Sequence, residues 1–231
     1  MSDLHFGKST ASFNPDVLAA RLNAAGAHLK RIRRLMSDYA FDELIVFVLG
    51  DVVDGSDIYP TQFHHQKITN VNEQIDILSD LLVEFLEEQC KVWGSVRVEA
   101  VPGNHGRSGH FTHELQNYDL LCYTMLELKL KAQQSNIKVN WNKTADPFIR
   151  KVKIRGHRYV LYHGLDIRMY QSIPWYGIMQ RVFRWLSTRI APFDVILIGH
   201  FHTFGYWVIN KVSVFLTGTM ITDDDWALRV L

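Results

Sequence analysis

The 231-residue sequence has few cysteines, no long apolar run and almost no net charge. Its two cysteines, Cys90 and Cys122, lie in separate helical patterns, which favours reduced thiols in a cytoplasmic protein over a disulfide framework. No apolar segment has the length of a membrane span, and no signal-peptide pattern is present, so we expect no membrane partner. A formal net charge of +1 excludes overall attraction to nucleic acid, so such attraction would require a local basic patch.

Internal repeats, low-complexity segments and linkers are also absent from the sequence. A chain of this length can build one sizeable core but is short for two. We therefore expect a single domain over residues 1–231.

Helical and strand-like patterns alternate along much of the chain. Apolar residues recur at helical spacing over residues 15–35, 71–93, 115–130 and 174–190. Strand-like runs occupy residues 44–49, 96–100 and 195–198, two hairpins are predicted over 148–162 and 206–216, and residues 226–231 predict a last strand. This order predicts an α/β fold of two packed sheets with helices outside.

Five clusters rich in Asp, Asn and His are spaced along the chain, and four of them follow strand-like runs. They are Asp3 with His5, Asp51 with Asp54, Asn104 with His105, His163 alone, and His200 with His202. Taken singly, each cluster is better explained as a loop, a turn or a core histidine. Together they are what a site at the carboxyl edge of an α/β sheet would require.

In this order the clusters resemble the motifs of the calcineurin-like metallophosphoesterases, D-x-H, G-D-x-x-D, G-N-H, H and G-H-x-H. The resemblance extends from Asp3 to His202. It implies a four-layer α/β/β/α sandwich of two mixed sheets flanked by helices, and a hydrolase that acts on phosphate esters. It also implies two metal sites, one formed by Asp3, His5 and His202, the other by Asn104, His163 and His200, with Asp51 bridging both.

Oxygen and imidazole ligands without thiolates suit hard to borderline divalent ions. We expect two such ions, Mn²⁺ first, with Fe²⁺, Mg²⁺ and Zn²⁺ as alternatives. The resemblance further implies that His105 is the general acid and that Asp54 is the carboxylate that orients it. Other members carry an acidic residue after G-N-H, whereas this chain has Gly106. Arg107 is expected to bind a phosphate oxygen, with a surface arginine as an equal alternative.

The motifs are most similar to those of the DNA-repair-exonuclease branch and of small phage or prokaryotic relatives. The expected substrate is therefore a phosphodiester, in DNA or a nucleotide. Gly55 stands where the protein-phosphatase pattern has Arg, which counts against that branch. The alternatives are a phosphomonoesterase acting on a phosphoprotein or small metabolite, and a non-catalytic scaffold that retains the fold.

Two further expectations concern the surface and the start of the chain. Relatives carry an apolar strand before the first motif, whereas only Met1 and Ser2 precede Asp3, which predicts a fraying segment and weak metal binding there. A nucleic-acid substrate would need a basic surface, and the only one predicted combines residues 30–34 with the basic side chains of the first hairpin: Arg150, Lys151, Lys153, Arg155 and Arg158.

Overall fold

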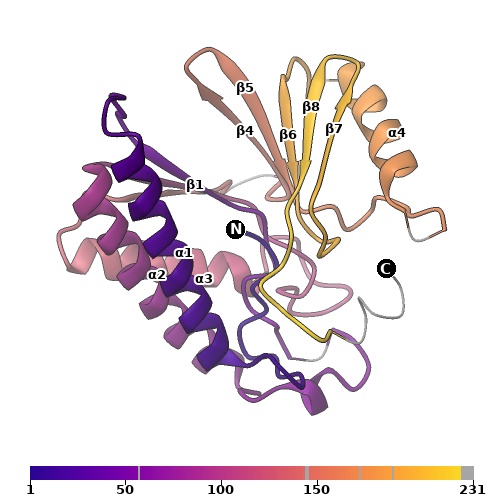
Figure 1. The fold of residues 1–231 in the computed structure, drawn as a ribbon. Helices are drawn as coiled ribbons and strands as arrows, with labels where there is room; N and C mark the ends of the chain where they lie inside the picture. The colour runs from indigo at the N-terminus through magenta and orange to yellow at the C-terminus, as the bar shows by residue number, and fades with distance from the viewer. Residues whose placement is uncertain (57, 144–145, 172, 189, 225–231) are drawn as a thin grey trace.

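Two β-sheets lie between two layers of helices (Figure 1). The computed structural model describes residues 1–56, 58–143, 146–171, 173–188 and 190–224. Three helices cover the smaller sheet and one covers the larger: α1 (Pro15–Leu35), α2 (Val71–Trp93) and α3 (Tyr118–Ala132) on one side, and α4 (Trp175–Leu186) on the other. The predicted four-layer sandwich is confirmed, whereas the last predicted strand, residues 226–231, lies outside the described residues.

The smaller sheet is parallel, and the larger sheet is mixed. The smaller contains, in spatial order, β1 (Leu44–Val48), β2 (Val96–Ala100) and β3 (Lys138–Asn140). The larger has the order β4 (Ile149–Ile154), β5 (His157–Tyr162), β6 (Val195–Ile198), β8 (Val212–Leu216) and β7 (Gly205–Ile209). Two mixed sheets were expected, but α2 and α3 are crossover helices that make each pair in the smaller sheet parallel.

Local signals explain most element boundaries. The side chain of Asn14 accepts hydrogen bonds from the backbone N–H groups of Asp16 and Val17 at the start of α1. Asn117 caps α3 in the same way, which is why this helix begins at Tyr118 and not at residue 115. Helix α4 ends at Leu186, earlier than predicted, and no helix among the described residues is long and apolar enough to span a membrane.

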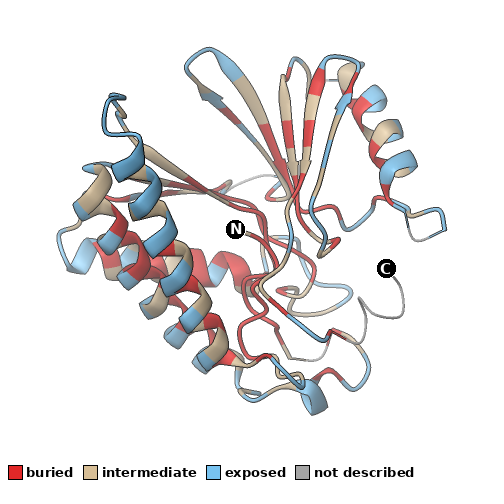
Figure 2. Ribbon diagram, viewed as in Figure 1, coloured by how far each residue is buried: buried red, intermediate tan, exposed pale blue. Residues whose placement is uncertain are grey.

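Apolar side chains between the two sheets join them to each other. They are distinct from those that pack each sheet against its helices. Leu49, Val101 and Leu161 are fully buried there, and the rings of Phe47 and Tyr159 stack with centroids 5.7 Å apart. In Figure 2 buried residues follow the inner parts of both sheets and the loops where they meet. This contact brings the carboxyl ends of β1 and β2 toward those of β5 and β6.

The first residues of the chain do not fray, contrary to the expectation from the sequence. The backbone N–H of Asp3 donates to Gly50 O at 3.0 Å, and that of His5 donates to Asp51 O at 2.9 Å. Leu4 is 0% exposed and packs in the core beneath the helices. The segment is fixed along the loop after β1 by main-chain hydrogen bonds, which a sequence pattern does not reveal.

Three arginines of the basic β4–β5 hairpin are paired with acidic side chains, and the expected phosphate-binding surface stays a prediction. Ion pairs join Arg150 to Glu99, Arg155 to Asp42, and Arg158 to Asp194. The turn between the two strands lies at the end of β5 opposite to His163, because β5 runs from His157 toward that residue. These arginines are therefore neutralised by acidic partners, and the turn is remote from the carboxyl ends of the strands.

Candidate metal centre

The predicted polar clusters meet at the carboxyl ends of strands from both sheets. Asp51 follows β1, Asn104 follows β2, His163 follows β5, and His200 follows β6. Residues of four of the five clusters border a cleft of about 780 Å³, whereas His163 lies buried beside Asp51 and Asn104. Potential ligand atoms form compact groups here, each within 4.8 Å of one another, so the structure brings together residues that lie up to 199 positions apart in sequence.

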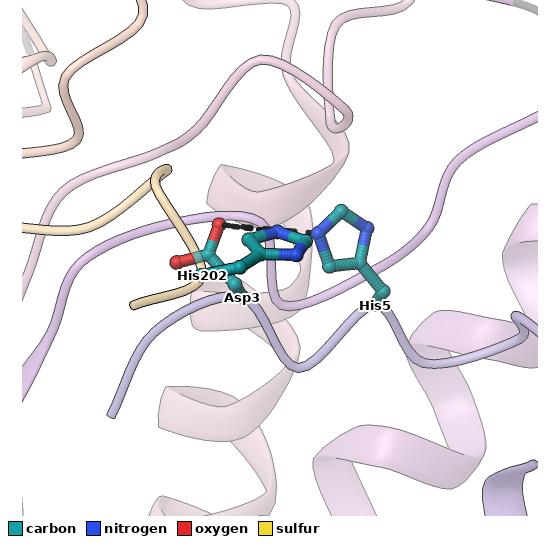
Figure 3. A group of neighbouring side chains, drawn as sticks. All are labelled: Asp3, His5 and His202. Atoms are coloured by element: carbon teal, nitrogen blue, oxygen red, sulfur yellow. Dashed lines mark ion pairs between the residues drawn. The ribbon is translucent and has the colours of Figure 1, made fainter. Parts of the chain in front are cut away.

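The first group contains Asp3, His5 and His202 (Figure 3). Asp3 Oδ1 lies 3.4 Å from His202 Nε2 and 3.9 Å from His5 Nε2. The other oxygen, Oδ2, accepts hydrogen bonds from the Ser2 hydroxyl and the His200 backbone N–H. Within the described part of the chain, Asp3 Oδ1 and His5 Nε2 are buried without a hydrogen bond, and such orphaned atoms fit a bound cation.

The second group contains Asp51, His163 and His200, with the amide of Asn104 beside them. His163 Nε2 lies 3.1 Å from Asp51 Oδ2 and 2.8 Å from Asn104 Oδ1. The amide nitrogen of Asn104 donates to the Tyr59 hydroxyl at 2.7 Å, so its oxygen faces the other ligand atoms. An oxygen-rich set with two imidazoles suits a divalent ion that prefers O and N donors.

Asp51 stands between the two groups. Its Oδ2 lies 3.1 Å from His163 Nε2 and 3.9 Å from His5 Nε2. Its Oδ1 accepts the backbone N–H of His105 at 2.8 Å. This position, in contact with both groups, is the one a bridging carboxylate would need.

Three of the histidines have an oxygen atom close to Nδ1, the ring nitrogen remote from the centre. Nδ1 of His5 lies 3.1 Å from Asp54 Oδ1, Nδ1 of His163 lies 2.7 Å from Leu49 O, and Nδ1 of His202 lies 3.2 Å from Asp224 Oδ2. Outer partners of this kind fix the ring orientation and leave Nε2 for a metal.

A buried carboxylate that the sequence analysis missed holds the two central loops. Asp119, at the start of α3, accepts backbone N–H groups of Asp51, Val52, Val53 and Gly103 at 2.8–3.3 Å. Burial, with the neighbouring Asp51 charge, raises the pKa of Asp119 to about 6. Its only sequence signal was an acidic residue in the first turn of a helix, which is common and indicates no function.

The backbone at the centre is tightly constrained. Asp3, His5, Asp51, His200 and His202 all have left-handed φ angles, between 43° and 72°. Such residues are uncommon outside glycine and persist where surrounding contacts over-determine them, often at functional sites. Gly103 allows the close approach of the loops, since a Cβ there would lie 2.1 Å from Asp51 Oδ1.

His105 faces the cleft at the edge of the second loop. Its Nδ1 lies 3.4 Å from Asp54 Oδ1 and 3.2 Å from the Asp54 carbonyl oxygen. Burial opposes protonation of His105, but the charges of Asp51 and Asp54 outweigh it and raise the pKa of the imidazole. Asp54 contacts His5 as well as His105, so it orients two rings and not only the one expected.

Arg107 is not among the described residues that line the cleft. Its Nε donates to Asn104 O at 2.9 Å, and its Nη2 lies 3.4 Å from the Tyr59 hydroxyl, which does border the cleft. The guanidinium therefore contacts the Asn104 carbonyl and the Tyr59 hydroxyl, and a direct contact between Arg107 and a phosphate remains a prediction.

The histidines of the centre divide into two neutral and two charged rings. Burial, with the charge of His105, lowers the pKa of His5 to about 4, and burial, with His163, lowers that of His200 to about 4. Burial also opposes protonation of His163 and His202, but Asp51 raises the pKa of His163 to about 9, and Asp224 with Asp3 raises that of His202 to about 9. Each metal group thus contains one neutral and one protonated imidazole at neutral pH.

Metal binding should therefore release protons and strengthen as pH rises. A cation binds only the neutral imidazole, so His163 and His202 must each lose a proton below their pKa of about 9. Calorimetric titration with Mn²⁺ should show affinity at each group rising by up to about tenfold per pH unit between about pH 6 and pH 8. An affinity independent of pH over that range would contradict the assigned charge states.

Comparison with solved structures gave distant matches. A predicted phosphoesterase from Streptococcus pneumoniae is 13% identical, with 95% of this chain and 70% of its own covered and a TM-score of 0.37. Vps29 complexed with Zn²⁺ from Entamoeba histolytica is 14% identical, with 77% and 73% covered and a TM-score of 0.28. A hypothetical protein from Pyrococcus horikoshii is 12% identical, with 87% and 73% covered and a TM-score of 0.39.

Comparison with curated protein sequences gave no match. The sequence model of the calcineurin-like phosphoesterases, in contrast, matches residues 1–215, nearly the whole chain. With the Asp and His groups described above, this match shows that the chain belongs to the calcineurin-like phosphoesterase family of metal-dependent hydrolases.

Proposed function

We propose that this phosphoesterase hydrolyses phosphodiester bonds in nucleotides or nucleic acid, using two divalent ions, preferably Mn²⁺. Asp3, His5 and His202 would hold one ion, Asn104, His163 and His200 the other, and Asp51 would bridge them. Two ions in such a centre supply the charge that activates a water and stabilises the phosphoryl transition state. A cytoplasmic location is part of the proposal, supported by the two free cysteines.

The observation that supports a diester is the scarcity of cationic side chains at the cleft. Among the described residues that line it, Lys8 is the only lysine or arginine, and it pairs with Asp224 at 2.8 Å. A monoester carries up to two negative charges near neutral pH, whereas a diester carries one. Beyond the proposed metals, the cleft has few cationic side chains to bind a second negative charge. It therefore suits the diester, which is the less charged ester.

The shape and lining of the cleft favour a nucleotide-sized substrate. A volume of about 780 Å³ lies within the range of small-molecule sites. The rings of Tyr59 and His65 line one side and offer surfaces on which a base can stack. Because the arginines of the β4–β5 hairpin are paired with acids, a long nucleic-acid strand has less support than a nucleotide or a chain end.

His105 is assigned to proton donation to the leaving oxygen. Its ring borders the cleft, its backbone N–H donates to Asp51, and the charges of Asp51 and Asp54 raise its pKa, which favours the protonated ring. Asp54 orients this ring through Nδ1, so Nε2 is the nitrogen available to a substrate. In this assignment the ligand carboxylates, Asn104 and the ligand histidines hold the ions, and His105 supplies the proton.

Hydrolysis of two simple esters tests the proposal. With Mn²⁺ present, kcat/KM should be higher for bis-p-nitrophenyl phosphate than for p-nitrophenyl phosphate, and chelator should abolish both activities. Asp51→Asn is the control for contaminating phosphatases, since it removes the bridging charge. Preference for the monoester would favour a phosphomonoesterase, and absence of turnover in metal-loaded protein would favour a scaffold.

His105→Ala tests the assignment of the proton donor. Activity should fall by roughly 10²–10⁴ for a diester with a poor alkoxide leaving group, and much less for p-nitrophenolate, which needs little protonation. His64→Ala is a control, because this imidazole is exposed and is not among the described residues that line the cleft. The assignment would be overturned if His105→Ala lowered activity by the same factor with both leaving groups, or if the variant lost a bound metal.

A further inference from the structure

The segment after β8 contacts the metal centre although it lies beyond the residues that the family model matches. The Thr219 hydroxyl donates to Asp3 O at 2.6 Å, and the Arg21 guanidinium donates to Met220 O. Farther along, Asp224 forms an ion pair with Lys8. Hydrogen bonds and an ion pair therefore hold residues 219–224 against the N-terminal segment that provides Asp3 and His5.

Asp224 contacts a predicted metal ligand directly. Its side chain is 6% exposed; Oδ2 lies 3.2 Å from His202 Nδ1, and Oδ1 accepts from Lys8 Nζ at 2.8 Å. On the opposite side of the ring, His202 Nε2 lies 3.4 Å from Asp3 Oδ1. The ion pairs among Asp3, His5 and His202 are drawn as dashed lines in Figure 3. The His202 imidazole thus connects Asp224 to the first metal group.

We propose that Asp224 is a positioning residue for metal binding at the first group. The carboxylate lies beside Nδ1, so its charge favours the tautomer of His202 that carries its hydrogen there and presents Nε2 to a cation, and it makes Nε2 a stronger ligand. Lys8 holds the carboxylate in place from its other oxygen. The inference rests on the metal-binding part of the proposed function and not on hydrolysis.

A purely structural role for Asp224 would have different consequences. If Asp224 only held residues 219–224 in place, loss of its charge would lower the free energy of unfolding without selectively changing metal affinity. The adjacent Asp223 is a matched control, since it has the same charge and also borders the cleft, whereas the ion pair to His202 Nδ1 among the described residues comes from Asp224. Asp224→Asn keeps the shape of the side chain and removes the charge.

Calorimetric titration with Mn²⁺ tests the proposal. Asp224→Asn should weaken one of the two binding events by about 10–100-fold and leave the other unchanged, whereas Asp223→Asn should stay within about threefold of the parent at both. Asp224→Glu, which keeps the charge, should recover most of the lost affinity. Visible absorption of Co²⁺-loaded protein should change in Asp224→Asn and not in Asp223→Asn.

Equal affinities in Asp224→Asn and the parent, or equal losses in both Asn variants, would overturn the role of Asp224. If Asp224→Asn does not fold, Asp224→Ser replaces it: selective weakening of one binding event supports the proposal, and affinities equal to the parent at both events overturn it. Failure of the parent to bind two ions would instead refute the metal centre, and binding without hydrolysis would refute only the proposed reaction.

Discussion

The site depends on the close approach of two loops, and a buried carboxylate makes that approach possible. Asp119 gathers backbone N–H groups from the loop after β1 and from the loop after β2. Those donors would otherwise be buried without partners, which is costly. With Gly103 allowing contact, Asp51 and Asn104 reach the same point in space. The metal centre is therefore built on backbone hydrogen bonds before any side chain of the ligand set is considered.

Electrostatic balance is the second constraint. Several carboxylates are buried together at the centre, and unpaired buried charge is unfavourable. The charged forms of His163 and His202 compensate Asp51 and Asp3, while His5 and His200 remain neutral because burial and nearby histidines oppose their protonation. Divalent ions can replace these protons without increasing the buried negative charge, which links folding, protonation and metal binding in one site.

Sequence patterns predicted the features that are local. The fold class, most helices and strands, and the ligand clusters follow from apolar periodicity and from Asp, Asn and His at strand ends. Asp119 and Asp224 were missed, because one is an ordinary acid in the first helical turn and the other lies among three consecutive aspartates. The acidic partners of the β4–β5 arginines and the hydrogen bonds that fix the N-terminal segment were not predicted, because each joins residues that are distant in sequence.

The central claim is that one carboxylate, Asp51, joins two ligand groups into a single dinuclear centre. Electron paramagnetic resonance of Mn²⁺-loaded protein tests it directly, because ions that share a bridge are magnetically coupled. At saturation the account predicts a coupled spectrum in the parent and a largely uncoupled one in Asp51→Asn. A spectrum of isolated ions in the saturated parent would contradict it.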